Sequence, residues 1–162
     1  MKKTIITCAI TGAIHTPTMS DALPYTYEDI AEQAIAAAHA GASILHLHAR
    51  NPKDGSPSVD PNDFAPCLKE IKASTDAVIN ISTGGSLTLS IQDRIKPAAT
   101  FSSEMCSMNM GSLNFSFHPL AKRYNEWKFD WEENYVANSN GNIFRNTFKD
   151  IEEAARTLAP QN

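Results

Sequence analysis

The sequence lacks the features that mark several protein classes. Its three cysteines, Cys8, Cys67 and Cys106, lie far apart and form no Cys-x-x-Cys pair. This spacing indicates neither a disulfide framework nor a four-thiolate zinc site, and we expect a cytoplasmic location. No segment approaches the roughly 18 uninterrupted apolar residues that a membrane helix needs, so we expect no membrane association.

Positive charge is also scarce. Lysine and arginine number 14 against 18 aspartates and glutamates, which gives a formal net charge of −4. A nucleic-acid-binding protein normally carries a basic face, and this sequence has no extended basic cluster. We therefore expect no nucleic-acid partner.

The residues that are present indicate an α/β fold. With 162 residues, 42% of them hydrophobic, the chain can bury one sizeable core, and we expect a single domain over residues 1–162. Apolar stretches that suit buried strands alternate with amphipathic stretches that suit helices, as in parallel βαβ units. We predict strands at 5–10, 43–48, 78–82 and 105–109, and helices at 26–41, 61–74, 90–97 and 147–158.

Residues 113–142 interrupt this alternation. Their aromatic side chains are scattered among polar residues, in a connection far longer than most loops. One interpretation is a satellite cluster of aromatics packed on the body of the protein, and the other is a lid or a subunit contact.

His46 and His48 are the first candidate site residues. They lie two apart at the end of a predicted strand, so both imidazoles share one face, with Cα atoms roughly 6.6 Å apart. Ligands of parallel α/β folds bind at the carboxyl ends of strands, which favours a shared metal such as zinc. The alternative is one buried and one loop-facing histidine. His15, after the first strand, is either a third ligand or an exposed loop residue.

The stretch Ser82-Thr83-Gly84-Gly85 directly follows a predicted strand. Two glycines let the backbone turn sharply and can leave amide N–H groups for a carboxylate or phosphate, with the Ser82 hydroxyl as a further donor. Glycine pairs after strands are also ordinary turns. Ser107 and Asn109 share one face of the fourth predicted strand, where they are able to orient a substrate by hydrogen bonds.

Arg50 lies two residues beyond His48 and allows two roles. Its guanidinium group can hold a ligand carboxylate, or it can pair with Asp54 or Asp60 and fix the intervening loop. We favour the structural role.

Five segments taken in order resemble the β-keto acid cleavage enzymes: ITCAITGAIHTP, AGASILHLHAR, VINISTGG, EMCSMNMGSLNF and FRNTFKDIE. The resemblance implies a zinc-dependent (β/α)₈ barrel that exchanges a β-keto acid with acetyl-CoA to give acetoacetate and a new acyl-CoA. It also implies roles for individual residues. These are His46 and His48 as zinc ligands, Ser82 and Asn109 as catalytic residues, and Ser82, Thr83, Gly84, Gly85, Ser107 and Asn109 as substrate-binding residues.

Two departures from this family qualify the expectation. Ile14 occupies a position where members that cleave an amino substrate look to carry a glutamate, so we expect an apolar or neutral β-keto acid. The chain also corresponds to about the first four βα units, whereas a whole barrel takes roughly 250 residues. In the family, the third zinc ligand and the general base come from the second half.

Three hypotheses follow. The first is a zinc-dependent β-keto acid cleavage enzyme, or its amino-terminal half, as a homo-oligomer. The second is a catalytically incomplete half-barrel that binds metal weakly and acts only through association. The third is a barrel-type enzyme whose glycine turn holds phosphate instead of carboxylate.

Overall fold

Four parallel strands form the sheet that organises the molecule. The computed structural model describes residues 3–86 and 88–159. The sheet strands are β1 (Thr7–Ala9), β2 (Ile44–Leu47), β5 (Val78–Ser82) and β6 (Met105–Ser107), hydrogen-bonded in the order β1-β2-β5-β6. All three neighbouring pairs are parallel, which confirms the predicted α/β class.

Helices connect these strands, and their ends follow local sequence signals. They are α1 (Tyr27–His39), α2 (Pro61–Ser74), α3 (Ile91–Thr100) and, after β6, α4 (Asp130–Ala137) and α5 (Phe148–Leu158). Side-chain oxygens of the N-cap residues Thr26, Ser90 and Thr147 each accept a backbone N–H three residues on. The bounds of α2 match the prediction.

The predicted end of the third helix at residue 97, where a proline was expected to help end it, was wrong. Pro97 lies inside this helix, which continues to Thr100. Proline removes one backbone donor, but its own carbonyl still accepts the N–H of Phe101, at 3.1 Å, so the last turn forms after it.

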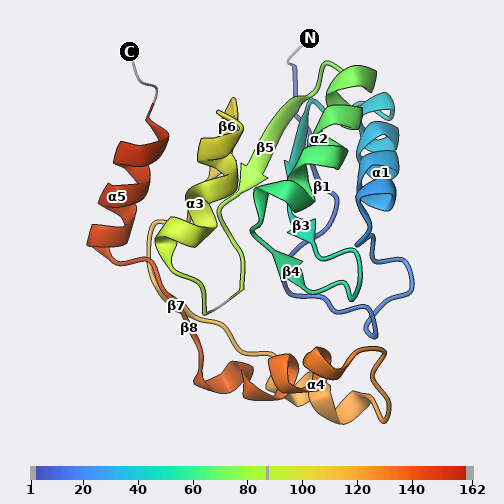
Figure 1. The fold of residues 1–162 in the computed structure, drawn as a ribbon, viewed down its shortest axis with the longest axis vertical. Coiled ribbons are helices and arrows are strands. Elements are labelled where there is room, and N and C mark those ends of the chain that lie inside the picture. The colour runs from blue at the N-terminus through green and yellow to red at the C-terminus, as the bar shows by residue number, and fades with distance from the viewer. Residues whose placement is uncertain (1–2, 87, 160–162) are drawn as a thin grey trace.

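One face of the sheet carries the main core. Leu45, Leu47, Ile79 and Ile81 point to the same side and are almost completely buried. They pack against the apolar faces of α1 and α2 in one continuous cluster, on the side where Figure 1 shows these two helices. Alternation along each strand therefore directs the intervening residues to the opposite face.

That opposite face is far more open. Thr7 and Met105 are exposed there, while Ile44 and Val78 are half-buried. Within the described residues, β1 and β6 are the edges of the sheet. None of the helices in this part of the chain is both long and apolar enough to cross a membrane.

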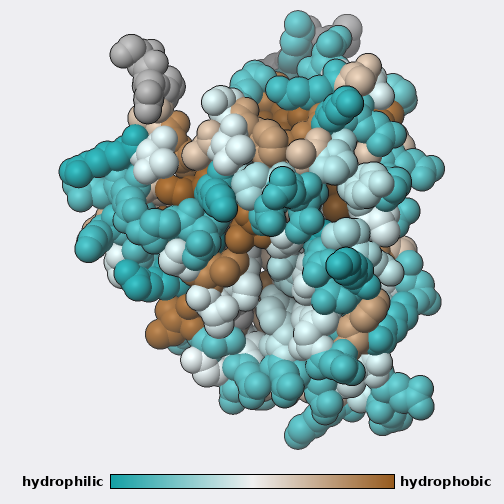
Figure 2. Space-filling model, viewed as in Figure 1, coloured by the Kyte–Doolittle hydropathy of each residue, from teal (hydrophilic) through white to brown (hydrophobic). Residues whose placement is uncertain are grey.

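Residues 113–142, predicted as a loop, contain regular structure. They include β7 (Leu113–Asn114), the 3₁₀ helices η1 (His118–Arg123) and η2 (Asn138–Gly141), and α4; β7 pairs antiparallel with β8 (Ile143–Phe144). A second antiparallel pair, β3 (Ala49–Arg50) with β4 (Pro57–Ser58), follows β2. Figure 2 shows apolar surface over the β7–β8 pair.

The aromatic-cluster interpretation of this segment is confirmed. Phe117, Val136 and Phe144 are buried together, and Trp127 and Tyr135 pack against them. In Figure 1, α4 lies below the sheet, on the side to which the arrowhead of β5 points. The segment therefore packs near the carboxyl ends of the parallel strands.

Glu132 ties α4 to the loop after β1. Its side chain is fully buried, and its two carboxylate oxygens accept the backbone N–H groups of Thr18, at 2.9 Å, and Phe129, at 3.0 Å. Lys128 adds a backbone hydrogen bond to the Thr18 hydroxyl at 2.8 Å. A buried carboxylate that satisfies two amides links segments more than a hundred residues apart.

We predict that Glu132→Ala lowers the free energy of unfolding by about 2–4 kcal/mol, because two backbone N–H groups lose charge-assisted hydrogen bonds to a buried carboxylate. Urea denaturation of the full chain measures this change. Glu133→Ala, at the exposed neighbouring position, is the control and changes stability by about 0.5 kcal/mol or less. Equal effects of the two substitutions would contradict the assigned link.

Candidate functional site

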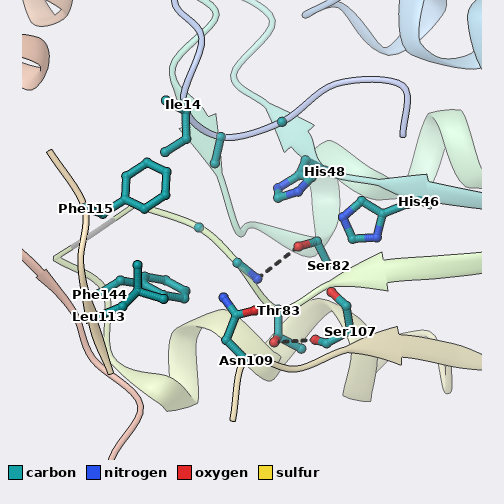
Figure 3. Close-up of a pocket in the computed structure, with 14 residues that line it drawn as sticks. Ile14, His46, His48, Ser82, Thr83, Ser107, Asn109, Leu113, Phe115 and Phe144 are labelled. Carbon is teal, nitrogen blue, oxygen red and sulfur yellow. Dashed lines mark hydrogen bonds between the residues drawn. The ribbon is translucent and has the colours of Figure 1, made fainter. Parts of the chain in front are cut away.

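A cavity of about 420 Å³ lies where the loops after β1, β2, β5 and β6 meet. Its lining brings together segments that are far apart in the sequence (Figure 3). The residues that line it are Gly12, Ala13, Ile14, His46, His48, Ser82, Thr83, Gly84, Gly85, Ser107, Asn109, Leu113, Phe115 and Phe144. The cavity thus brings together all the residues for which the family resemblance implies a role: His46, His48, Ser82, Thr83, Gly84, Gly85, Ser107 and Asn109.

The two histidines face each other in this cavity. The ring centroids of His46 and His48 are 5.1 Å apart, and their planes are inclined at 75°. His46 belongs to β2, and His48 follows it on the same side of the sheet, as the two-residue spacing predicts. The alternative, in which the rings separate into core and loop, is wrong.

Both imidazoles are held neutral. Burial lowers the pKa of His46, and the neighbouring Asn80 side chain opposes this effect. Burial lowers the pKa of His48 to about 3, and electrostatic repulsion from the adjacent His46 ring and from the Arg50 guanidinium adds to this lowering. A neutral imidazole carries the lone pair that coordination of a metal ion requires.

Asn80 lies on the strand next to His46. It pairs in register with His46 across the sheet, and its buried Oδ1 atom has no hydrogen-bond partner in the described part of the chain. Metal-binding histidines usually donate their second ring N–H to an oxygen acceptor. The unpartnered oxygen beside His46 fits that role.

A third ligand is not in place. His15 is exposed and does not line the cavity, so the structure leaves it as a loop residue. Across residues 3–86 and 88–159, no three His, Cys, Asp or Glu side chains are grouped so that they could hold a metal. The histidine pair therefore fits two positions of a zinc coordination sphere, whereas catalytic zinc takes three protein ligands.

The turn after β5 is built around glycine. A Cβ atom on Gly84 would lie 3.1 Å from the Ser82 Oγ atom and 3.5 Å from the His48 Cε1 atom. One on Gly85 would lie 3.0 Å from Val59 and 3.2 Å from Leu89. Glycine at both positions thus lets the turn pass close to His48 and to the side chains of Val59 and Leu89.

Hydrogen bonds inside this turn use one of the backbone N–H groups that we expected to be free for an anion. The Gly84 N–H is not free, because it donates to the Ser82 Oγ atom at 3.0 Å. By accepting this bond, Ser82 keeps its own hydroxyl proton for another acceptor. Thr83 is almost fully buried, and its hydroxyl donates to the Ser107 carbonyl at 2.6 Å. Thr83 therefore joins β5 to β6, while Ser82 presents the hydroxyl.

The register of the sheet places the remaining polar groups. Ser82 and Ser107 are partners across β5 and β6, so their side chains share the cavity face. Asn109 follows on the same side, and Figure 3 shows it beside Thr83 and Ser107. The alternation predicted for β6 placed both residues correctly, although the strand ends at Ser107 rather than at Asn109.

Arg50 fixes the loop that forms another side of the cavity. Its guanidinium group is buried and donates to the carbonyl oxygens of Gly12, His15, at 2.7 Å, and Gly55, at 2.7 Å. It also donates to the Thr11 hydroxyl at 3.0 Å. The favoured structural role is confirmed, but the partners are backbone carbonyls, where Asp54 or Asp60 was expected.

Several residues at the cavity were not predicted. Leu113 and Phe144 of the β7–β8 pair and Phe115 directly after β7 line it. Tyr135 supports it by donating its hydroxyl to the Ala13 carbonyl at 2.7 Å. The aromatic content of residues 113–142 did single out this segment in the sequence. A strand of two residues shows no periodicity, however, so the sequence could not predict which of its side chains face the cavity.

Neutral histidines and convergent polar groups at the carboxyl edge of a parallel sheet define an α/β protein with a ligand site of enzyme type. Comparison with protein families gives a match to the beta-keto acid cleavage enzymes over residues 3–162. The chain belongs to this family.

Curated relatives agree with this assignment. The chain is 53% identical over 151 residues to a 3,5-dioxohexanoate:acetyl-CoA acetone transferase of Paraburkholderia graminis, covering 93% of this chain and 49% of the relative. It is 41% identical over 116 residues to a 3-keto-5-aminohexanoate cleavage enzyme of Fusobacterium nucleatum, covering 71% and 42%. A 3-oxoadipate:acetyl-CoA acetyltransferase of Cupriavidus necator is 36% identical over 116 residues, covering 68% and 38%. The chain spans about half the length of these relatives or less.

We predict that Arg50→Lys lowers the free energy of unfolding by about 2–4 kcal/mol, because lysine cannot reach four separated acceptors and several carbonyls lose the donor that the buried guanidinium supplies. Chemical denaturation measures the change, with the exposed Lys53→Ala as control. If the Arg50 variant kept its stability but bound a carboxylate ligand more weakly, Arg50 would instead have the role of holding the ligand carboxylate.

Proposed function

We propose that this chain carries the metal-binding and substrate-holding part of a zinc-dependent β-keto acid cleavage enzyme. The observation that carries this proposal is the meeting of His46, His48, Ser82, Ser107 and Asn109 at one cavity. Membership of the family supplies the reaction class, and the cavity supplies groups that suit its substrate. The reaction is exchange of a β-keto acid with acetyl-CoA, which gives acetoacetate and a new acyl-CoA.

His46 and His48 would hold the zinc ion, with Asn80 fixing the His46 ring. Zinc bound there would draw electron density from the substrate's keto oxygen. The lowered pKa values of both histidines keep their lone pairs available. In this proposal, the source of the third ligand lies outside the described residues.

The substrate carboxylate is assigned to the turn after β5. Ser82 has a hydroxyl proton free to donate, and Gly84 and Gly85 allow close approach to the backbone. Ser107 and Asn109 add a hydroxyl and an amide at the neighbouring strand end, which suit the orientation of the keto acid. We propose that Ser82 and Asn109 have the catalytic role that the family resemblance implies, Ser82 by holding the carboxylate and Asn109 by orienting the keto acid.

Proton abstraction needs a further group. No Asp, Glu, Lys or Arg is among the residues that line the cavity in the described part of the chain. A general base must lie within hydrogen-bond reach of the proton it removes. We therefore propose that the sheet is part of a (β/α)₈ barrel, about four βα units of it, and that the base belongs to the remainder or to another copy in a homo-oligomer.

The names of the relatives show which part of the substrate varies. The β-keto acids named for them have an uncharged tail in 3,5-dioxohexanoate, an amino group in 3-keto-5-aminohexanoate and a second carboxylate in 3-oxoadipate. The shared β-keto acid group matches the polar residues of this cavity. Specificity within the family class then depends on the tail.

Zinc binding tests the first part of this proposal. We predict that the purified chain binds one zinc ion per chain in a titration followed by calorimetry and elemental analysis, and that His46→Ala abolishes this binding. His39→Ala removes an exposed histidine at the end of α1 and leaves it intact. Loss of zinc in neither variant would rule out the histidine pair as the metal site.

Acetoacetate binding tests the second part. We predict that Ser82→Ala weakens acetoacetate binding to the zinc-loaded chain about tenfold, which corresponds to one lost hydrogen bond to a charged group. Ser74→Ala, at an exposed position at the end of α2, leaves the affinity unchanged. An equal affinity of both variants would remove Ser82 from the site. Zinc and acetoacetate binding without turnover would favour the catalytically incomplete half-barrel.

A further inference from the structure

The cavity has two chemically different sides. His46, His48 and Ser82 lie on one side, and Figure 3 shows an opposing group of apolar side chains. This group, called the apolar wall below, consists of Ile14, Leu113, Phe115 and Phe144. Three of its four members come from the β7–β8 pair and the residue that follows β7.

The apolar wall is held in place from behind. Leu113 and Phe144 are partners across β7 and β8, so their spacing is set by the pairing. The ring of Phe115 meets that of Phe117 edge to face, with centroids 6.0 Å apart. A wall built on paired backbone and packed rings needs little rearrangement to receive a ligand.

Arg94 supports Phe144 from another element. The guanidinium carbon of this buried α3 residue lies 4.6 Å from the centre of the Phe144 ring. Its Nη2 atom donates to the Arg145 carbonyl at 2.9 Å and to the Asn146 Oδ1 atom at 2.8 Å. A positively charged guanidinium group therefore lies against the Phe144 ring. Its Nη2 atom donates to residues that come just before α5.

This arrangement disfavours a charged ligand group against the wall. An ammonium group would lose water without gaining a carboxylate, and it would approach the positive charge behind Phe144. A carboxylate would be separated from Arg94 by the Phe144 ring. An uncharged chain, in contrast, gains by burying its apolar surface against four apolar side chains.

We propose that the apolar wall is the subsite for the tail of the β-keto acid, and that it selects tails that are uncharged and largely apolar beyond the keto carbon. This inference rests on the proposed function, because that function places the carboxylate and keto groups on the opposite, polar side of the cavity. Leu113 and Phe144 of the β7–β8 pair, and Phe115 directly after β7, are thereby specificity-determining residues.

Calorimetric titration of the full, zinc-loaded chain tests this inference with three β-keto acids of equal chain length. The compounds are 3-oxohexanoate, 5-amino-3-oxohexanoate and 3-oxoadipate. We expect 3-oxohexanoate to bind at least about tenfold more tightly than either charged compound, which is the discrimination that one group in a pocket can provide. Equal binding of the three, or tighter binding of a charged one, would overturn the inference.

Substitutions in the wall sharpen the test. Phe115 is partly exposed, at 36%, so Phe115→Glu can fold with a carboxylate in the wall. We expect this variant to bind 5-amino-3-oxohexanoate more tightly than the wild type does and 3-oxohexanoate less tightly. Phe115→Leu keeps the wall apolar and retains the wild-type order of affinities.

Ile143→Glu is the matched control for charge. Ile143 lies on β8 next to Phe144, is 57% exposed and does not line the cavity. It adds the same charge to the same strand pair, so it leaves the order of affinities unchanged. If Ile143→Glu and Phe115→Glu alter selectivity equally, the effect is a general one of net charge and the tail subsite is wrong.

The outcome separates this inference from the proposed function. Failure of acetoacetate and all three compounds to bind would reject the β-keto acid site as a whole. Binding that depends on Ser82 but shows no preference among the tails would reject the apolar wall alone.

Discussion

The buried guanidinium group of Arg50 is the contact on which the shape of the cavity depends. It satisfies carbonyls from the loop after β1 and from the turn between β3 and β4, and so brings two loops together beside β2. Burial lowers the pKa of Arg50 to about 10, which still leaves it charged near neutral pH. Because His48 lies two residues earlier, the same stretch of chain provides a candidate metal ligand and the support for the opposite loop.

The parallel register explains why polar groups from distant segments meet. Ala9, His46 and Asn80 are aligned across three strands, and Ser82 is aligned with Ser107 on the next pair. In a parallel sheet all carboxyl ends lie at one edge, so each strand delivers its last side chains to the same place. Among the described residues that line the cavity, none belongs to a helix, and α1 and α2 instead bury the other face of the sheet.

Sequence patterns predicted the sheet and the polar side of the cavity well. Periodicity of two along β2 and β6 was enough to place His46, His48, Ser107 and Asn109, and cap residues such as Ser90 marked helix starts. The strands and helices within residues 113–142 could not be predicted in this way. Their short strands and 3₁₀ turns are stabilised by tertiary contacts, such as the buried Glu132 carboxylate, and leave no regular pattern in the sequence.

The links between α4 and the loop after β1 have a consequence for folding. Tyr135 bonds to Ala13 across 122 positions, and Glu132 bonds to Thr18 across 114. During synthesis from the amino terminus, the βαβ units can pair early, but this side of the cavity stays unformed until α4 has emerged. Closing so long a loop slows folding more than it lowers stability. The cavity therefore forms late in refolding, after α1 and α2 have packed on the sheet.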